Sequence, residues 1–294
     1  MEPIKQTSFE NKELTALGIE PIRLEDMRDK LPAVAERLEF YILILVTAGS
    51  GKHSVDFVEY GLSTGSLLFV RPGQVQEWSD YAELDAEVVL IDPKSLPYGD
   101  NMYAADSSLL ALDRWQNCTL LPSSLYDDLL AALLRLRRDF TAFNGSQLDI
   151  ALVRHEVLSI LLRLARWQDQ LSSMVSLPSR SQKTYQLFIQ LLEQQYTAQH
   201  SLNYYAQRLG YAQSTLSRAC LKYEGVSAKV VIDRRIALEA QRILAHSRAS
   251  VAEVGFYLGF SETTNFIKFF KRVLGTTPSV FQRNARGNHN PNPI

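Results

Sequence analysis

A repeated helical unit occupies residues 202–275, in two copies, and constrains the fold more than any other stretch. The two copies match at an offset of 49 positions up to an aromatic residue, and at an offset of 50 after it. Each copy has an apolar-periodic segment, a small residue, a glycine four positions later and a second apolar-periodic segment. Two short helices that cross steeply around a tight turn need this pattern, so two tandem helix-turn-helix units are predicted. The matched pairs are Leu202/Val251, Tyr205/Val254, Ala206/Gly255, Leu209/Leu258, Gly210/Gly259, Tyr211/Phe260, Leu216/Phe266, Cys220/Phe270 and Gly225/Gly275.

The net charge changes sign along the chain. Of the 31 Lys/Arg and 32 Asp/Glu residues, 15 basic and 6 acidic residues lie from Ser179 to the end, which leaves 16 and 26 in the first 178 residues. Because the positive charge coincides with the repeat, this split favours a nucleic-acid-binding module attached to an acidic sensor or oligomerisation domain. The alternative explanation is a pair of domains that attract each other.

The remaining composition is that of a globular protein, with 46% hydrophobic and 21% charged residues in a chain long enough for two domains. Cys118 and Cys220 belong to no C-x-x-C pair, so neither a disulfide framework nor a zinc site is indicated. The N-terminus has no signal-peptide pattern, and the longest apolar run, Phe40–Val46, is too short to cross a bilayer. A cytoplasmic protein without membrane contact is therefore expected.

Short strands separated by Gly and Pro are predicted between Phe40 and Ile91, which favours an antiparallel barrel or sandwich. Two amphipathic helices are predicted to follow, over 125–140 and 148–171. The second helix has an apolar face so wide that it must be buried, against the barrel, against a second copy of the chain, or both.

Part of this strand region resembles known sensor and cupin barrels. The run GSLLFVRPGQVQEW, residues 65–78, resembles the second half of a cupin barrel, and the run GKHSVDFVEYGLSTG, residues 51–65, resembles the sensor half of AraC-type regulators. Metal-dependent cupins hold their metal with a pair of His, a Glu and a further His. Only His53 stands near the first pair here, and Gln76 occupies the place of the later His. The resemblance therefore implies a barrel with no metal, no cofactor and no catalysis, in which His53 is an ordinary polar residue near the mouth. A cupin-type metal enzyme with an accessory helical domain is the alternative.

A non-catalytic barrel of this size can still enclose one small-molecule effector. Strand alternation alone does not say which side chains point inward, and each candidate is equally explained as an edge or surface group. Arg71 is a candidate partner for an anionic ligand, or else a solvated strand end. The candidate lining residues are His53, Tyr60, Arg71, Gln76 and Trp78.

The second helix of each repeat unit, predicted over Gln213–Tyr223 and Glu262–Leu274, presents hydroxyl, amide and basic groups opposite its apolar face. Such side chains suit a helix in the major groove of DNA, where they bind base edges and phosphates. A merely solvated face would carry more acid than the single Glu262. A long helix over 227–245 is predicted to contact both units and to fix the angle between them. The residues predicted to contact DNA are Ser214, Thr215, Ser217, Arg218 and Lys222 in the first unit and Thr263, Thr264, Asn265, Lys268 and Lys271 in the second.

The repeat also resembles a known signature. Residues 234–283, with Gly259-Phe260, Phe266, Phe270-Lys271, Gly275 and Pro278, resemble the AraC/XylS family of transcription regulators, and residues 201–225 match the first unit of that family. The resemblance implies seven helices that place two recognition helices in successive major grooves. It implies a ligand-responsive regulator, with an activator favoured over a repressor. The implied partners are double-stranded DNA, a small effector, RNA polymerase and a second copy of the chain.

One residue departs from the family pattern. Gly255 stands where the family usually has Ala, and this costs up to about 1 kcal/mol of helix propensity. The second unit is therefore expected to be looser than the first. An interaction protein that has kept the fold without binding DNA is a third alternative.

The predicted fold class is α+β with two domains. Residues 1–172 form a cupin-like ligand-sensing and oligomerisation domain, which combines the β-barrel with a helical segment for packing or dimerisation. Residues 173–182 form a Ser-rich linker that contains Pro178, and residues 183–286 form an all-α, seven-helix double helix-turn-helix domain. Residues 287–294 are expected to be a flexible tail.

Overall fold

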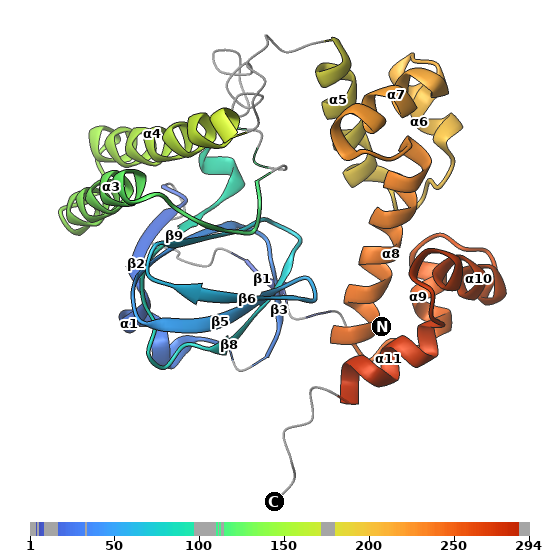
Figure 1. Cartoon of the computed structure of the whole chain (residues 1–294), viewed down its shortest axis with the longest axis horizontal. Helices are drawn as coiled ribbons and strands as arrows, with labels where there is room; N and C mark the ends of the chain where they lie inside the picture. The colour runs from blue at the N-terminus through green and yellow to red at the C-terminus, as the bar shows by residue number, and fades with distance from the viewer. Residues whose placement is uncertain are drawn as a thin grey trace, which may run out of the picture. The chain divides into compact units, whose positions relative to one another are not determined.

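The computed structural model describes residues 4, 6–8, 17–32, 34–96, 110, 112, 115–171 and 180–287. These residues divide into two compact units, one within residues 5–175 and the other formed mainly by residues from 176 onward (Figure 1). The predicted linker 173–182 and tail 287–294 lie largely outside the described residues.

Two five-stranded sheets form the first unit. Their strand orders are β1-β3-β8-β5-β6 and β10-β7-β4-β9-β2, and among the described strands only β1 and β3 pair in parallel. The predicted antiparallel, barrel-like domain is therefore confirmed. The strands are β1 (Gln6–Thr7), β2 (Ile19–Arg23), β3 (Glu36–Leu38), β4 (Tyr41–Ala48), β5 (Ser50–Val55), β6 (Val58–Ser63), β7 (Ser66–Val70), β8 (Val75–Asp80), β9 (Asp85–Ile91) and β10 (Cys118–Leu120), with short helical turns α1 (Leu24–Met27), η2 (Arg28–Lys30) and η3 (Pro93–Ser95).

Strand β4 is apolar at every position along most of its length because both faces of its sheet are covered. Successive side chains of a strand point to opposite faces. Ile42 and Ile44 therefore enter the core between the two sheets, whereas Leu43 and Leu45 enter a second core on the other face. Full burial of such a side chain stabilises the fold by roughly 1.5–3 kcal/mol. The cores on both faces of the sheet explain the unbroken apolar run in the sequence.

Helices α3 (Ser123–Thr141) and α4 (Gln147–Leu171) supply the second core. They lie side by side on one side of the strands (Figure 1) and bury Leu133 and Leu136 of α3 with Val157 and Leu161 of α4 against the outer face of the sheet. Part of the wide apolar face of α4 is thus buried against the barrel, as one of the two explanations predicted. Within the described part of the chain, no helix combines the length and the apolar character needed to span a membrane.

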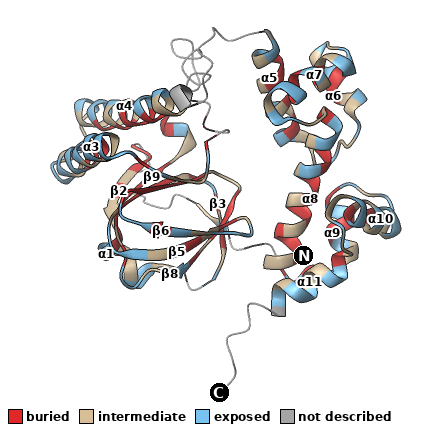
Figure 2. Cartoon of the chain, in the orientation of Figure 1, coloured by how far each residue is buried: buried red, intermediate tan, exposed pale blue. Residues whose placement is uncertain are grey.

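Seven helices form the second unit among the residues that the structure describes, which confirms the predicted all-α domain. The central helix α8 is buried along much of its length, as Figure 2 shows, and contacts helices of both repeat units. It therefore acts as the common core of the unit. The helices are α5 (Arg180–Gln195), α6 (Leu202–Leu209), α7 (Gln213–Glu224), α8 (Ala228–His246), α9 (Val251–Tyr257), α10 (Thr263–Leu274) and α11 (Pro278–Gly287).

Candidate nucleic-acid interface and ligand cavity

The first helix pair, α6 and α7, turns at Gly210. The side chain of Ser201 caps α6 by accepting a hydrogen bond from the backbone N–H of Asn203, and Gly210 ends the helix with a φ of 71°. That left-handed conformation favours glycine. The N–H of Tyr211 then donates to the carbonyl of Ala206 over 2.9 Å, which closes the turn and directs the chain into α7.

The second pair, α9 and α10, repeats this geometry with one additional constraint. Ser250 and Glu253 form a capping box at the start of α9, and the N–H of Phe260 donates to the carbonyl of Gly255 over 3.0 Å. Gly259 has a φ of 80°, and a Cβ added there would lie 2.3 Å from the carbonyl oxygen of Thr197. The second turn is therefore packed directly on the backbone that links α5 and α6.

Gly255 of α9 packs against Phe266 of α10. A Cβ at this position would lie 3.1 Å from Cβ of Phe266, which is tighter than ordinary van der Waals contact. The missing side chain thus allows the Phe266 ring to approach the helix backbone. Close packing against a fully buried ring offsets at least part of the helix propensity that glycine loses.

Aromatic rings hold α10 in place. The ring centroid of Phe266 lies 5.4 Å from that of Phe260 and 5.8 Å from that of Phe270, and Phe270 in turn lies 5.7 Å from Phe281 of α11. Phe266 and Phe270 are completely buried. Because these rings fix one face of α10 toward the core, the opposite face is presented to solvent in a defined orientation.

The ten residues predicted to contact DNA all belong to α7 or α10, and most are exposed. Arg218 donates from Nε to the carbonyl of Ser214 at 3.4 Å, and Thr264 donates to the Glu262 carboxylate at 3.1 Å. The exposed members are Ser214, Arg218, Lys222, Thr264, Asn265, Lys268 and Lys271, and the half-buried members are Thr215, Ser217 and Thr263. The structure thus gathers each set on one helix.

The two helix pairs share an asymmetry at their N-termini. The leading helices α6 and α9 are capped by Ser201 and Ser250. The N-cap residues of α7 and α10 are Ala212 and Glu262, and neither makes a side-chain cap bond. The first backbone N–H groups of α7 and α10 therefore keep their capacity to donate. Such groups, at the positive end of the helix dipole, bind phosphate well.

Asp233 of α8 is a positioning residue that sequence analysis missed. Its buried carboxylate accepts hydrogen bonds from Lys229 Nζ over 2.6 Å and from Arg272 Nη2 over 3.1 Å. The second bond ties α8 to α10. The spacing of Lys229 and Asp233, four positions apart on one helix, was the available sequence signal.

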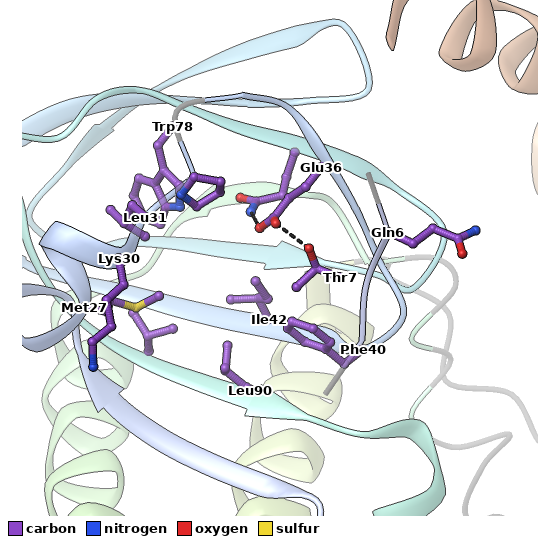
Figure 3. Close-up of a pocket in the computed structure, with 13 residues that line it drawn as sticks. Gln6, Thr7, Met27, Lys30, Leu31, Glu36, Phe40, Ile42, Trp78 and Leu90 are labelled. Atoms are coloured by element: carbon purple, nitrogen blue, oxygen red, sulfur yellow. Dashed lines mark hydrogen bonds between the residues drawn. The ribbon is translucent and has the colours of Figure 1, made fainter. Parts of the chain in front are cut away.

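A cavity of about 350 Å³ opens into the first unit and has a mostly apolar wall (Figure 3). Two of the five residues predicted to line a ligand site, Gln76 and Trp78, belong to it. The full lining is Gln6, Thr7, Met27, Lys30, Leu31, Pro32, Glu36, Phe40, Ile42, Gln76, Trp78, Val88 and Leu90. The lining residues before Phe40 were missed because their segment has no strong strand pattern. The available sequence signal was the alternation of Glu36, Leu38 and Phe40, which continues at Ile42 and marks side chains that point inward.

The polar end of this cavity is a small hydrogen-bonded group. Glu36 accepts at Oε1 from Gln76 Nε2 over 2.8 Å and at Oε2 from the Thr7 hydroxyl over 2.5 Å. Glu36 and Gln76 are 6% and 2% exposed, so both are held inside the domain. The three residues come from β1, β3 and β8, which the sheet order places side by side.

The other three predicted lining residues do not line the cavity. Arg71 donates from Nη1 to the carbonyl of Trp115 over 2.5 Å, so its guanidinium contacts backbone. Tyr60 is half-buried on β6. The expectation that His53 lies near the barrel mouth was wrong: the residue is completely buried, and its ring centroid lies 4.4 Å from that of Trp78 in an edge-on contact. Position 53 is an inward position of β5, which the loose alternation in the sequence did not establish.

His53 is expected to make the first unit sensitive to acid. Neither ring nitrogen has a hydrogen-bond partner among the described residues, and burial lowers the pKa of His53 to about 3. Between this value and the unfolded pKa of about 6.5, only the unfolded chain binds the proton, so stability falls as the pH falls through that range. From pH 7 to pH 5 the loss due to His53 is about 2 kcal/mol.

Urea unfolding followed by Trp fluorescence measures this loss, because all three Trp residues lie in the first 175 positions. His53→Gln provides the comparison, since it removes the titrating group while the carboxylates that also respond to pH remain. Wild type should lose about 2 kcal/mol more than His53→Gln between the two pH values. Equal losses would show that folding does not lower the pKa of His53.

The described residues contain no group of three or more His, Cys, Asp or Glu side chains that is arranged to hold a metal ion. A metal-dependent cupin reaction would need such a group. The structure therefore gives no support to the enzyme alternative.

Each of the two units contains a region that matches the model of a known protein family. A family model described as a helix-turn-helix domain matches residues 205–284, and one described as an AraC-like ligand binding domain matches residues 17–80. The chain is 24% identical over 258 residues to the HTH-type transcriptional activator RhaS of Pectobacterium carotovorum, which covers 84% of this chain and 86% of that protein.

Two further similarities are shorter or weaker. The chain is 31% identical over 75 residues to the regulatory protein PocR of Salmonella typhimurium, which covers 26% of this chain but only 25% of that protein. Among solved structures, ToxT from Vibrio cholerae covers 92% of this chain and 99% of its own, at 13% identity and a TM-score of 0.41.

Proposed function

The chain belongs to the AraC family of transcription regulators, and from this premise we propose that α7 and α10 read two successive major-groove segments of an operator. The observation that carries the proposal is the repeated geometry: two helix pairs on one central helix, each with a second helix that exposes hydroxyl, amide and basic groups. These groups lie in the part of the chain that carries 15 of the 31 basic residues.

Each kind of exposed side chain on α7 and α10 suits a particular group on the DNA. Arg218 and Lys268 suit guanine O6 and N7, and Asn265 suits adenine, because these pairings match the pattern of donors and acceptors in the major groove. The Ser and Thr residues near the start of each helix suit phosphates, together with the uncapped N–H groups of α7 and α10. Lys222 and Lys271 supply further charge for the DNA backbone.

The regulator is proposed to be an activator with no catalytic activity of its own. The RhaS proteins to which it is similar over most of its length are named transcriptional activators. An activator needs contact with the transcription machinery, so RNA polymerase is a proposed partner. Its place of action would be the cytoplasm, where bacterial operators are found.

The first unit is proposed to sense a small effector in the cavity at Gln76 and Trp78, and to change DNA occupancy when the effector binds. Footprinting of the purified chain on the DNA upstream of its own gene and on neighbouring promoters tests the proposal, with and without candidate effectors. Two protected segments on one face of the DNA are expected. No protection on any of these DNAs under any condition would refute DNA reading by this chain.

The exposed side of α4 is proposed to pair with a second copy of the chain. Leu148, Leu152 and Leu162 are exposed there, on the same helix that buries Val157 in its own domain. With His155, Ser159 and Arg166 they follow alternating steps of three and four residues, the heptad spacing of helices that pair. A self-complementary pair of α4 helices would cover this stripe.

Replacing Leu152 by glutamate should weaken such a dimer at least about tenfold, because each copy would lose a buried leucine and gain a charge at the contact. Sedimentation velocity over a range of concentrations measures the effect. Leu120→Glu is the matched control, since Leu120 is 66% exposed at the end of β10 and lies outside the stripe. A monomeric wild type, or equal association of all three proteins, would overturn the dimer proposal.

A further inference from the structure

We propose that the effector of this protein is a small, mostly apolar molecule whose polar end is a hydrogen-bond donor and which carries no carboxylate or other anionic group. This inference rests on the proposed sensing function of the first unit and adds the chemical class of the ligand. It follows from the polar end of the cavity, from its charge and from its apolar wall.

The polar end presents an acceptor that needs a donor. Gln76 lines the cavity, and its side-chain amide donates from Nε2 to Glu36, which fixes the orientation of the amide. Gln76 is 2% exposed, and Oε1 has no hydrogen-bond partner among the residues that the structure describes. Buried acceptors are almost always paired in folded proteins. An O–H or N–H of the ligand would supply the missing bond.

The carboxylate of Glu36 makes the same end of the cavity unfavourable for an anion. The Glu36 carboxylate lies within hydrogen-bond distance of Gln76 and Thr7, so a second carboxylate at Gln76 would face a like charge in a desolvated site. Lys30, the cation among the described lining residues, is exposed, and Figure 3 shows its ammonium on the side away from Glu36. Arg71, a candidate partner for an anionic ligand, contacts the Trp115 carbonyl.

The rest of the wall is apolar. Phe40, Ile42 and Leu90 lie together along one side in Figure 3, and Trp78 stands across from them. A cavity of about 350 Å³ is at the lower end of the range for small-molecule sites. It therefore suits a compact ligand with one polar end rather than a molecule that is polar on all sides.

Four probes with one carbon skeleton test the ligand class. Ethylbenzene has no polar end, 2-phenylethanol ends in a hydroxyl, 2-phenylethylamine ends in an ammonium, and phenylacetate ends in a carboxylate. Isothermal titration of the full chain at pH 7 should give tighter binding of the alcohol or the amine than of ethylbenzene, by about fivefold or more, with phenylacetate weakest. The two donor probes separate a neutral hydroxyl ligand from a cationic amine.

Two variants locate the effect. Gln76→Leu should weaken binding of the favoured donor probe about five- to tenfold and leave ethylbenzene unchanged, because only the donor probe loses a hydrogen bond. Gln147→Leu makes the same chemical change at an exposed site on α4 and should alter nothing. Glu36→Gln should raise the affinity for phenylacetate. The order of the four probes on wild type needs no variant, so the test holds even if Gln76→Leu does not fold.

The outcomes separate the ligand class from the proposed function. Tightest binding of phenylacetate, equal binding of ethylbenzene and the donor probes, or binding of none of the four at millimolar concentration would overturn the ligand class. A footprint on DNA would still stand in each case. The expected probe order without any footprint would overturn the proposed DNA reading and leave the chemistry of the cavity intact.

Discussion

Replacing Arg218 or Lys268 by alanine is expected to weaken binding to the operator by about 1–3 kcal/mol each, which is roughly a 5- to 150-fold rise in Kd. Both side chains are exposed, and they lie on the two helices whose opposite faces are fixed in the core. Neither side chain contributes to the core, because the buried contacts come from Leu216 and Cys220 of α7 and from Phe266 and Phe270 of α10. The loss should therefore appear in DNA affinity and not in stability.

Fluorescence anisotropy at fixed salt measures this loss, with the DNA protected in the footprint and a scrambled sequence of the same composition. Substitution of a residue that reads a base should lower the affinity for the operator only. Substitution of a residue that contacts a phosphate should lower the affinity for both DNAs and reduce the slope of the salt dependence by about 1. Lys183→Ala removes the same charge from the exposed side of α5 and is the control. If neither Arg218→Ala nor Lys268→Ala changed the affinity, α7 and α10 would not be the reading helices.

Gly259→Ala is expected to destabilise the second unit by about 3 kcal/mol, and Gly210→Ala by only about 1 kcal/mol. The two glycines have matching positions in the repeat and similar φ values of 80° and 71°, so each substitution meets the same cost of a left-handed conformation, about 1–2 kcal/mol. A Cβ at 210 would meet no atom within 4 Å, whereas one at 259 would lie 2.3 Å from the Thr197 carbonyl oxygen. That clash forces backbone movement, which costs about 1–3 kcal/mol more.

The two units can be observed separately in this experiment. All three Trp residues lie in the first unit, and seven helices lie in the described part of the second. Circular dichroism at 222 nm during urea unfolding should therefore show the larger shift for Gly259→Ala, while the Trp fluorescence transition stays where it is in wild type. Equal shifts for the two variants would mean that the Thr197 contact does not form in solution.

The helical unit was predictable from sequence because its signals are local. A small residue, a glycine four positions later and an aromatic residue after it describe one tight turn, and the structure forms that turn at both Gly210 and Gly259. The pattern did not show how the turns at Gly210 and Gly259 differ. The contact of Gly259 with Thr197 joins residues 62 positions apart, so no local spacing could indicate it.

The cavity was less predictable because its residues come from strands far apart in the sequence. Gln76 and Trp78 were identified from a resemblance, but Glu36 and Thr7 reach them only through the sheet order β1-β3-β8. His53 and Arg71 show the converse problem. Both are polar residues of the barrel region, yet one is buried against Trp78 and the other contacts the Trp115 carbonyl. Side-chain direction depends on register, which the sequence pattern alone left undetermined.

Helix α8 makes the spacing between α7 and α10, the two proposed reading helices, a property of the protein and not of the DNA. Its 19 residues span about 28 Å, a little less than one turn of B-DNA, and it contacts both α7 and α10. Asp233 fastens α10 to it, and the turn at Gly259 rests on the Thr197 backbone. The two half-sites of an operator must therefore keep one helical phase. Adding half a turn of DNA between them would rotate the second half-site to the opposite face of the duplex, beyond the reach of α10.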